Sequence, residues 1–79
     1  MTEEQRKAIL VETVREYGSK EWFRDATVWD HFPTTNEPML ELKVNYVPVF
    51  ERKYIIEFAA RHGLREKYTI VDRRGNPVE

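Results

Sequence analysis

Four side chains between residues 25 and 41 of this 79-residue sequence could supply oxygen and nitrogen ligands to a divalent metal ion. They are Asp25, Asp30 and His31, with Glu41 facing them across a predicted hairpin. Their spacing matches no ligand motif such as His-Glu-x-x-His. A polar strand edge with ordinary surface charges explains the same residues. We therefore expect no metal site and no other cofactor.

Groups suited to catalysis are scarce. His62, near the predicted end of a helix, could act as a general base, but the helix dipole also favours a histidine there. The sequence has no cysteine, which excludes thiolate catalysis, disulfides and cysteine-based zinc sites. It has no Gly-x-Ser-x-Gly elbow, and none of its three glycines forms a phosphate-binding loop. We expect no catalytic residues, and a protein that is not an enzyme.

Basic residues gather in the second half of the chain and could bind phosphate groups of a nucleic acid. Tyr54 and Tyr68 lie among them and could stack on single-stranded bases, or 67–78 could form the wing of a winged helix. Against this, the net charge is −1, acidic residues are interspersed, and Glu57 and Arg61 have the spacing of a helical ion pair. Nucleic-acid binding is the alternative function, and its predicted residues are Arg52, Lys53, Arg61, Arg65, Lys67, Arg73 and Arg74.

Aromatic side chains are dense between residues 22 and 46, and most of them should belong to the core. Trp29 or Phe32 could instead form an exposed patch on the outer face of a sheet, and aromatic residues are typical anchors of protein interfaces. We predict that a partner protein contacts Trp29, Phe32 and Tyr46, with His31 and Glu37 at the rim.

The elements that must position these residues begin with a helix over 3–17. Thr2 and Gln5 have the spacing of a capping box, and Gly18 is expected as the C′ residue. Its apolar face is predicted to contain Leu10, Val14 and Tyr17, flanked by Ile9, Val11 and Thr13. The segment 19–32 is ambiguous, because Trp22, Ala26 and Trp29 also have helical spacing. We favour a helical turn at 20–24 followed by a strand at 26–31.

Prolines bracket a loop over 33–38, which is long for a hairpin and is a candidate binding loop. A strand over 39–47 follows, with Leu40, Leu42, Val44 and Tyr46 on one face, and Pro48 ends it. The apolar period then changes from two to about 3.6 residues, which predicts a helix over 49–62. Its broad apolar face is expected to contain Phe50, Tyr54, Ile55, Phe58, Ala59 and His62, widened by Ile56 and Ala60.

Gly63 is expected as the C′ residue of this second helix, with Leu64 packing back on Ala59 in a Schellman motif. A final strand over 67–72 and a turn-forming tail at 73–77 complete the chain. The predicted fold is a single α+β domain over 1–79 in the order α-β-β-α-β. It has a three-stranded, mostly antiparallel sheet with two helices on one face.

No apolar run approaches the length of a membrane span, so we expect a cytoplasmic protein that does not bind membranes. Charge is mildly uneven, with six basic and nine acidic residues in 1–50 and seven basic and five acidic in 51–79. The favoured function is a small non-enzymatic interaction domain of bacterial or phage type: an adaptor, inhibitor or regulator. Its sheet face or edge and the 33–38 loop would bind another protein, and an edge-to-edge homodimer would cover the open edges.

Overall fold

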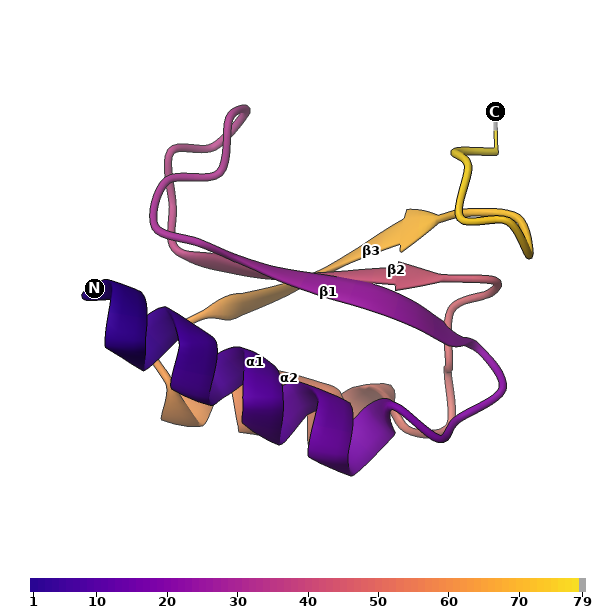
Figure 1. Ribbon diagram of the computed structural model, residues 1–79, viewed down its shortest axis with the longest axis horizontal. Coiled ribbons are helices and arrows are strands. Elements are labelled where there is room, and N and C mark those ends of the chain that lie inside the picture. The colour runs from indigo at the N-terminus through magenta and orange to yellow at the C-terminus, as the bar shows by residue number, and fades with distance from the viewer. Residues whose placement is uncertain (79) are drawn as a thin grey trace.

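A computed structural model describes residues 1–78 (Figure 1). The elements are α1 (Glu3–Tyr17), β1 (Phe23–Trp29), β2 (Met39–Val44), α2 (Arg52–Arg61) and β3 (Arg65–Ile70). This is the predicted α-β-β-α-β order, and the α+β fold class is confirmed. The helical alternative for the segment after α1 is wrong, because 18–22 form turns and β1 follows directly.

The sheet has the strand order β1-β2-β3 and is mixed. β1 and β2 are antiparallel, with Trp29 opposite Met39 at one end. β2 and β3 are parallel, from Met39 opposite Arg65 to Val44 opposite Ile70. One of the two strand pairs is antiparallel and the other is parallel. The sheet is therefore mixed, and not mostly antiparallel as predicted. The cause is the crossover through α2, which returns the chain to the end of the sheet where β2 begins.

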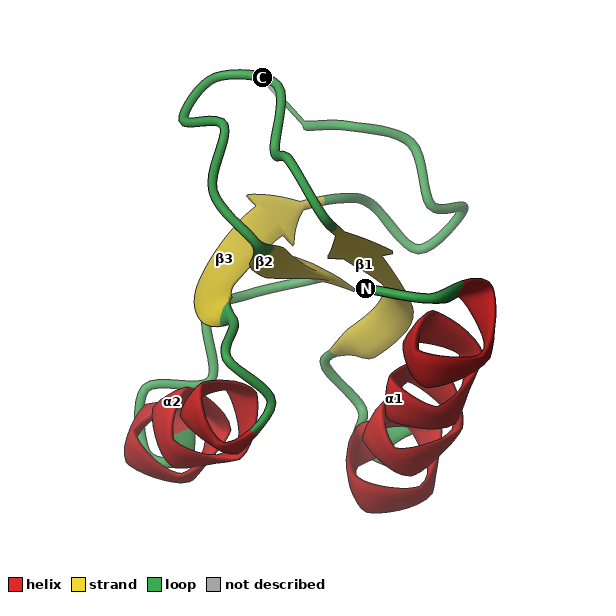
Figure 2. Cartoon of the chain, turned by 90° about the vertical axis from the view of Figure 1, so that its left-hand side faces the viewer, coloured by secondary structure: helices red, strands yellow, loops and turns green. Residues whose placement is uncertain are grey.

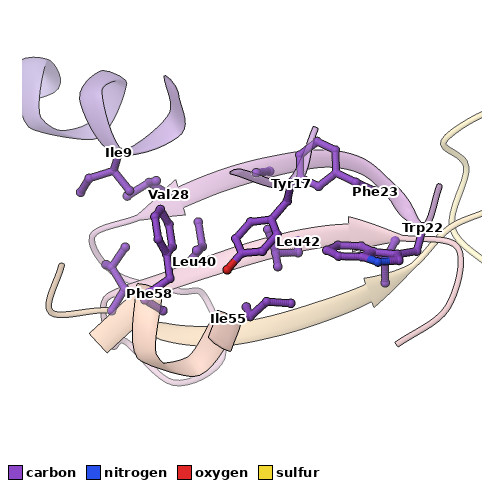
Figure 3. Packing of buried hydrophobic residues seen from close by; sticks show 13 residues of the cluster. Ile9, Tyr17, Trp22, Phe23, Val28, Leu40, Leu42, Ile55 and Phe58 are labelled. Atoms are coloured by element: carbon purple, nitrogen blue, oxygen red, sulfur yellow. The ribbon is translucent and has the colours of Figure 1, made fainter. Parts of the chain in front are cut away.

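Both helices lie on the same face of the sheet, as predicted (Figure 2). The core lies between these two layers, and alternate residues of the central strand form its floor: Leu40, Leu42 and Val44 are 0% exposed. Ile9 of α1 and Ile55 and Phe58 of α2 pack in the same cluster (Figure 3). The period of two in β2 buries one face of that strand under the helices and leaves the other face on the far side of the sheet.

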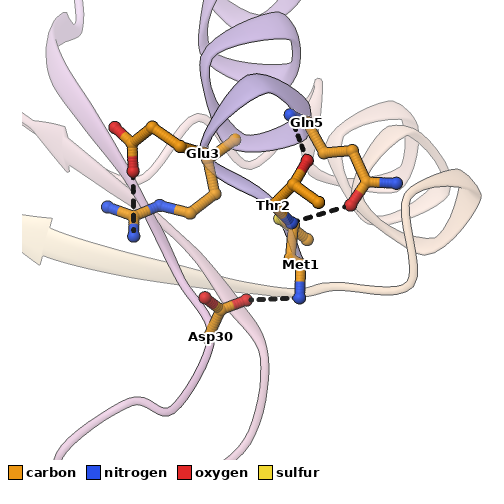
Figure 4. Close-up of polar contacts among 6 residues, drawn as sticks. Met1, Thr2, Glu3, Gln5 and Asp30 are labelled. Carbon is orange, nitrogen blue, oxygen red and sulfur yellow. Dashed lines mark hydrogen bonds and ion pairs between the residues drawn. The ribbon is translucent and has the colours of Figure 1, made fainter.

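The capping box at the start of α1 is present as predicted (Figure 4). The Gln5 amide N–H donates to Thr2 Oγ1 over 3.1 Å, and the Thr2 N–H donates to Gln5 Oε1 over 2.9 Å. The terminal amine of Met1 lies 3.5 Å from Asp30 Oδ1, which ties the chain start to the segment after β1. The first turn of α1 is therefore held both locally and by a tertiary contact.

The buried stripe of α1 differs from the predicted one. Ile9, Thr13 and Tyr17 are buried, whereas Val11 and Val14 are more than half exposed. Thr13 can enter the core because its hydroxyl donates to the Ile9 carbonyl oxygen over 2.7 Å, leaving no unpaired polar group. Ile9 and Thr13, which were predicted to flank the apolar face, therefore form the buried stripe together with Tyr17.

The two predicted glycine caps behave differently. Gly18 ends α1 in a right-handed conformation, with φ of −62°, so it is not the left-handed C′ residue that we predicted. An added Cβ at Gly18 would collide with the Val14 carbonyl oxygen. Gly63 has φ of +72°, and the Schellman motif is confirmed: the Leu64 N–H donates to the Ala59 carbonyl and the Gly63 N–H to the Ala60 carbonyl.

Most of the predicted element boundaries are displaced by two to three residues. β1 spans 23–29 instead of 26–31, β2 spans 39–44 instead of 39–47, α2 spans 52–61 instead of 49–62, and β3 spans 65–70 instead of 67–72. Two consecutive turns around Pro48 cause the differences at β2 and α2: the Val49 N–H donates to the Val47 carbonyl, and the Glu51 N–H donates to the Pro48 carbonyl. The turn-forming tail is confirmed, with Val71 and Pro77 forming an isolated antiparallel bridge.

We expect Thr2→Ala to lower the free energy of unfolding by about 1 kcal/mol, because the Gln5 amide loses its capping oxygen. Thr2→Ser keeps that oxygen and should retain most of the stability. Urea unfolding followed by circular dichroism measures both variants. If the two variants lost equal amounts of unfolding free energy, the Thr2 hydroxyl would not be stabilising α1.

Candidate functional site

The sheet face opposite the helices presents polar and aromatic side chains in rows across the three strands. Strand register places Thr27, Glu41 and Lys67 in one row, and Asp25, Lys43 and Thr69 in the next. A third row contains Trp29, Met39 and Arg65. We call this surface the outer face. The core cluster between the sheet and the helices contains none of the residues in these rows, although Met39 is itself buried.

Two half-buried aromatic rings meet at one end of the outer face. Trp29 and Phe32 pack edge to face, with ring centroids 5.6 Å apart, and Lys67 Nζ lies 5.9 Å from the Phe32 centroid. The 33–38 loop frames them, because Arg65 Nη1 lies 2.9 Å from Glu37 Oε2 and the Phe32 N–H donates to the Glu37 carbonyl. We call these five residues the aromatic corner. Figure 1 shows the loop rising on the side of the sheet away from the helices.

Glu41 joins all three strands on the outer face. Its Oε1 accepts a 2.9 Å hydrogen bond from Trp29 Nε1 on β1, and its Oε2 accepts a 2.6 Å hydrogen bond from Thr69 Oγ1 on β3. Hydrogen bonds to a carboxylate are stronger than neutral ones. Glu41 therefore holds the Trp29 ring in one orientation beside the loop.

Three of the four residues considered for a metal site have other partners. Asp25 accepts from the Ala26 N–H, Asp30 pairs with the terminal amine, and Glu41 binds Trp29 and Thr69. Among residues 1–78, no group of three His, Cys, Asp or Glu side chains is arranged to hold a metal ion.

The predicted protein contacts divide between two ends of the sheet. Trp29, Phe32 and Glu37 lie in the aromatic corner, and exposed His31 adjoins them in sequence. Tyr46 follows the opposite end of β2 and donates a 2.9 Å hydrogen bond to Glu21 Oε1, which raises the pKa of the Tyr46 phenol. Tyr46 therefore lies beyond the opposite end of β2 from the aromatic corner.

The predicted basic surface is also divided. Arg52, Lys53 and Arg61 lie on α2, Arg65 and Lys67 on β3, and Arg73 and Arg74 in the tail. Several have local partners: Arg52 Nη2 lies 3.6 Å from Glu66 Oε1, and Arg65 pairs with Glu37. Arg65 and Lys67 are the two that border the aromatic corner.

His62 connects the two helices. Its Nε2 lies 3.0 Å from Glu12 Oε2 of α1, and its ring packs edge to face on Phe58 with centroids 5.2 Å apart. This arrangement gives His62 a structural role at the end of α2.

The turn after β2 presents apolar side chains to solvent, and sequence reasoning missed this feature. Val47, Val49 and Phe50 are 36%, 67% and 95% exposed, although Phe50 had been assigned to the core face of a helix. Because α2 begins only at Arg52, Phe50 lies before the helix and outside its buried stripe. We call residues 46–50 the apolar turn. The signal that could have found it is a proline between two apolar pairs, which forces a turn where the periodicity suggested a helix.

A hollow of about 280 Å³ adjoins the apolar turn and is lined by Trp22, the five residues of the turn, and Glu51. Glu51 fastens the turn to the segment between α1 and β1: its Oε1 lies 2.8 Å from Lys20 Nζ, and its Oε2 accepts a 2.8 Å hydrogen bond from Trp22 Nε1. The bond from Lys20 is the main cause of the lowered pKa of the Glu51 carboxyl, and the bond from Trp22 adds to it.

No family model matches this sequence, and no curated protein or solved structure matches it either.

Within residues 1–78, no helix has both the length and the apolar character needed to cross a membrane.

We expect Glu41→Gln to destabilise the protein by about 1–2 kcal/mol, because the amide nitrogen cannot accept one of the two donated hydrogen bonds. The indole N–H resonance of Trp29 should shift in a proton–nitrogen correlation spectrum, whereas that of Trp22 should not. Thr69→Val provides the second arm of a double-mutant cycle. Additive losses for Glu41 and Thr69 would show that the two side chains are not coupled.

Glu51 should contribute to acid denaturation. Since its folded pKa is below the ordinary value of 4.5, its contribution to stability is present above pH 4.5 and is lost as pH falls through the folded pKa. We expect Glu51→Gln to be less stable than the parent at pH 7, and the difference to shrink on acidification. Thermal melts at pH 7, 5 and 3 test this. A stability difference between the parent and Glu51→Gln that stays constant across the three pH values would contradict this prediction.

Proposed function

We propose that this chain is a non-enzymatic protein-interaction domain that uses the aromatic corner and the adjoining outer face to bind another protein. The observation that carries the proposal is the pair of large rings, Trp29 and Phe32, on the sheet face that the helices do not cover. Interface hot spots are enriched in tryptophan and arginine and are surrounded by polar groups. Here Arg65, Glu37 and Lys67 surround the rings.

The packing of the corner favours binding. Glu41 fixes the indole by a hydrogen bond, and the Glu37–Arg65 pair frames the loop. A side chain that is already ordered loses little conformational entropy when a partner contacts it. The half-buried state of both rings leaves them part of their area to bury against a partner.

Binding of single-stranded nucleic acid is the second candidate, and one observation favours it at the same place. Lys67 lies over Phe32, and Arg65 is beside it, so a stacking ring and two cations share one surface. This combination is typical of single-strand binding. Opposing it, Glu37 pairs with Arg65, and Glu41 occupies the next row of the face.

A photo-crosslinking experiment tests the protein-binding proposal. A benzoyl-phenylalanine replaces exposed His31, beside the corner, or exposed Lys7 on α1 as the matched control. When the variants are irradiated in cells of the organism that encodes this chain, we expect position 31 to form a discrete covalent adduct with another protein. Position 7 should form none. Trp29→Ala and Lys67→Glu should each abolish the adduct while the protein stays folded by circular dichroism. An identical adduct pattern from both positions, or adducts that survive both substitutions, would refute the proposal.

Titration with mixed-sequence oligonucleotides separates the alternative. Nucleic-acid binding predicts a steep loss of affinity between 50 and 200 mM salt, and a shallower slope in Arg65→Gln and Lys67→Gln. Arg73→Gln and Arg74→Gln, in the tail, show whether a different basic segment is responsible. Absence of binding at the lower salt concentration would remove the alternative.

A further inference from the structure

We infer that the apolar turn is a self-association surface, through which two copies of this chain form a two-fold symmetric dimer. The turn carries a projecting side chain, Phe50, at 95% exposure, and it borders the hollow of about 280 Å³ described above. A projection and a recess thus occur on one face of the same chain. This inference is independent of the aromatic corner, which lies at the other end of β2.

The size and chemistry of the recess suit a phenyl ring. An enclosed apolar cavity of roughly 150 Å³ is enough to bind benzene. The recess here is larger and open, and its walls are mainly apolar: Trp22, Val47, Pro48 and Val49 contribute to it. The ring of a partner's Phe50 could enter it and lie against these side chains.

The charged residue in the lining does not oppose burial. Glu51 already has Lys20 Nζ and Trp22 Nε1 at 2.8 Å from its two oxygens. A carboxylate with a cation and a hydrogen-bond donor in place needs less from water than an unpaired one. Covering the turn therefore leaves no isolated charge in the interface.

A second copy is the occupant that satisfies both features at once. In a two-fold interface residue i of one copy contacts residue j of the other, and the reverse contact forms automatically. Phe50 of each copy would fill the recess of its partner, and the two turns would cover one another. An unrelated protein would need to present both a matching projection and a matching recess.

The available area makes the dimer weak. A standard interface buries roughly 800 Å² per partner, which is about a seventh of the 5612 Å² surface of this chain. The side chains of the turn offer on the order of 400 Å² per copy. We therefore expect a dimer that forms at micromolar or higher concentrations and dissociates on dilution.

Sedimentation analysis between about 1 μM and 1 mM tests the inference. We expect concentration-dependent dimerisation of the parent chain. Phe50→Ser should raise the dissociation constant by about 30-fold or more, as for an interface hot spot. Val11→Ser, at an apolar position on α1 that is 56% exposed, should leave it unchanged. Circular dichroism confirms folding of each variant, and Phe50 is too exposed to be needed for the fold.

The absence of cysteine from the sequence allows a geometric test. Val49→Cys should form a disulfide-linked dimer under mild oxidation, because symmetry brings the two turns together. Val11→Cys should not. A chain that is monomeric at 1 mM, or a dimer that forms equally well with Phe50→Ser, would overturn the inference. Crosslinks that form equally from both positions would also overturn it. None of these results bears on the aromatic corner.

Discussion

The burial of alternate side chains along β2 is the constraint on which the rest of this structure depends. Leu40, Leu42 and Val44 are fully covered, with β1 on one edge, β3 on the other, and both helices against the same face. A domain this small buries only about 60% of the surface of its unfolded chain, so its stability margin is narrow. A truncated buried leucine typically costs about 2–5 kcal/mol, which is a large part of a total of about 5–15 kcal/mol.

This central strand also determines where the exposed features lie. The loop that frames the aromatic corner enters β2 at Met39, and the segment that leads to the apolar turn leaves β2 after Val44. Six residues of strand span roughly 20 Å. The two surfaces therefore lie at opposite ends of the sheet. A partner at the corner and a second copy at the turn could bind at the same time without contacting each other.

The features that were predicted correctly depend on local rules. The capping box of Thr2 and Gln5, the left-handed Gly63 and the alternation through Leu40, Leu42 and Val44 each require only neighbours within a few residues. The fold class followed from these elements and their order.

The features that were missed depend on competition between local rules and tertiary packing. Thr13 lies within the buried stripe and not only at its flank, because a carbonyl of its own helix satisfies the hydroxyl. β3 is parallel to β2 because α2 returns the chain to the end of the sheet where β2 begins. Phe50 is exposed because two consecutive turns around Pro48 precede α2, so the helix begins only after Phe50. Apolar periodicity alone would have placed it in the core. β2 also ends at Val44, so Tyr46 lies in the segment between β2 and α2 and not on the strand as predicted.

The two surfaces differ in how their aromatic side chains are held, and this difference is the reason for proposing a different kind of partner for each. Trp29 has a hydrogen bond from its indole and a ring against it, so it is already ordered and loses little freedom when it is covered. A fixed ring with polar neighbours can discriminate between partners, because a mismatch leaves those polar groups unpaired. Phe50 is almost completely exposed and has no polar group. Its burial is driven by apolar area, which gives affinity but little selectivity. Selectivity at the turn must then come from shape, and in the dimer that we propose the complementary shape is the projection and recess of a second copy.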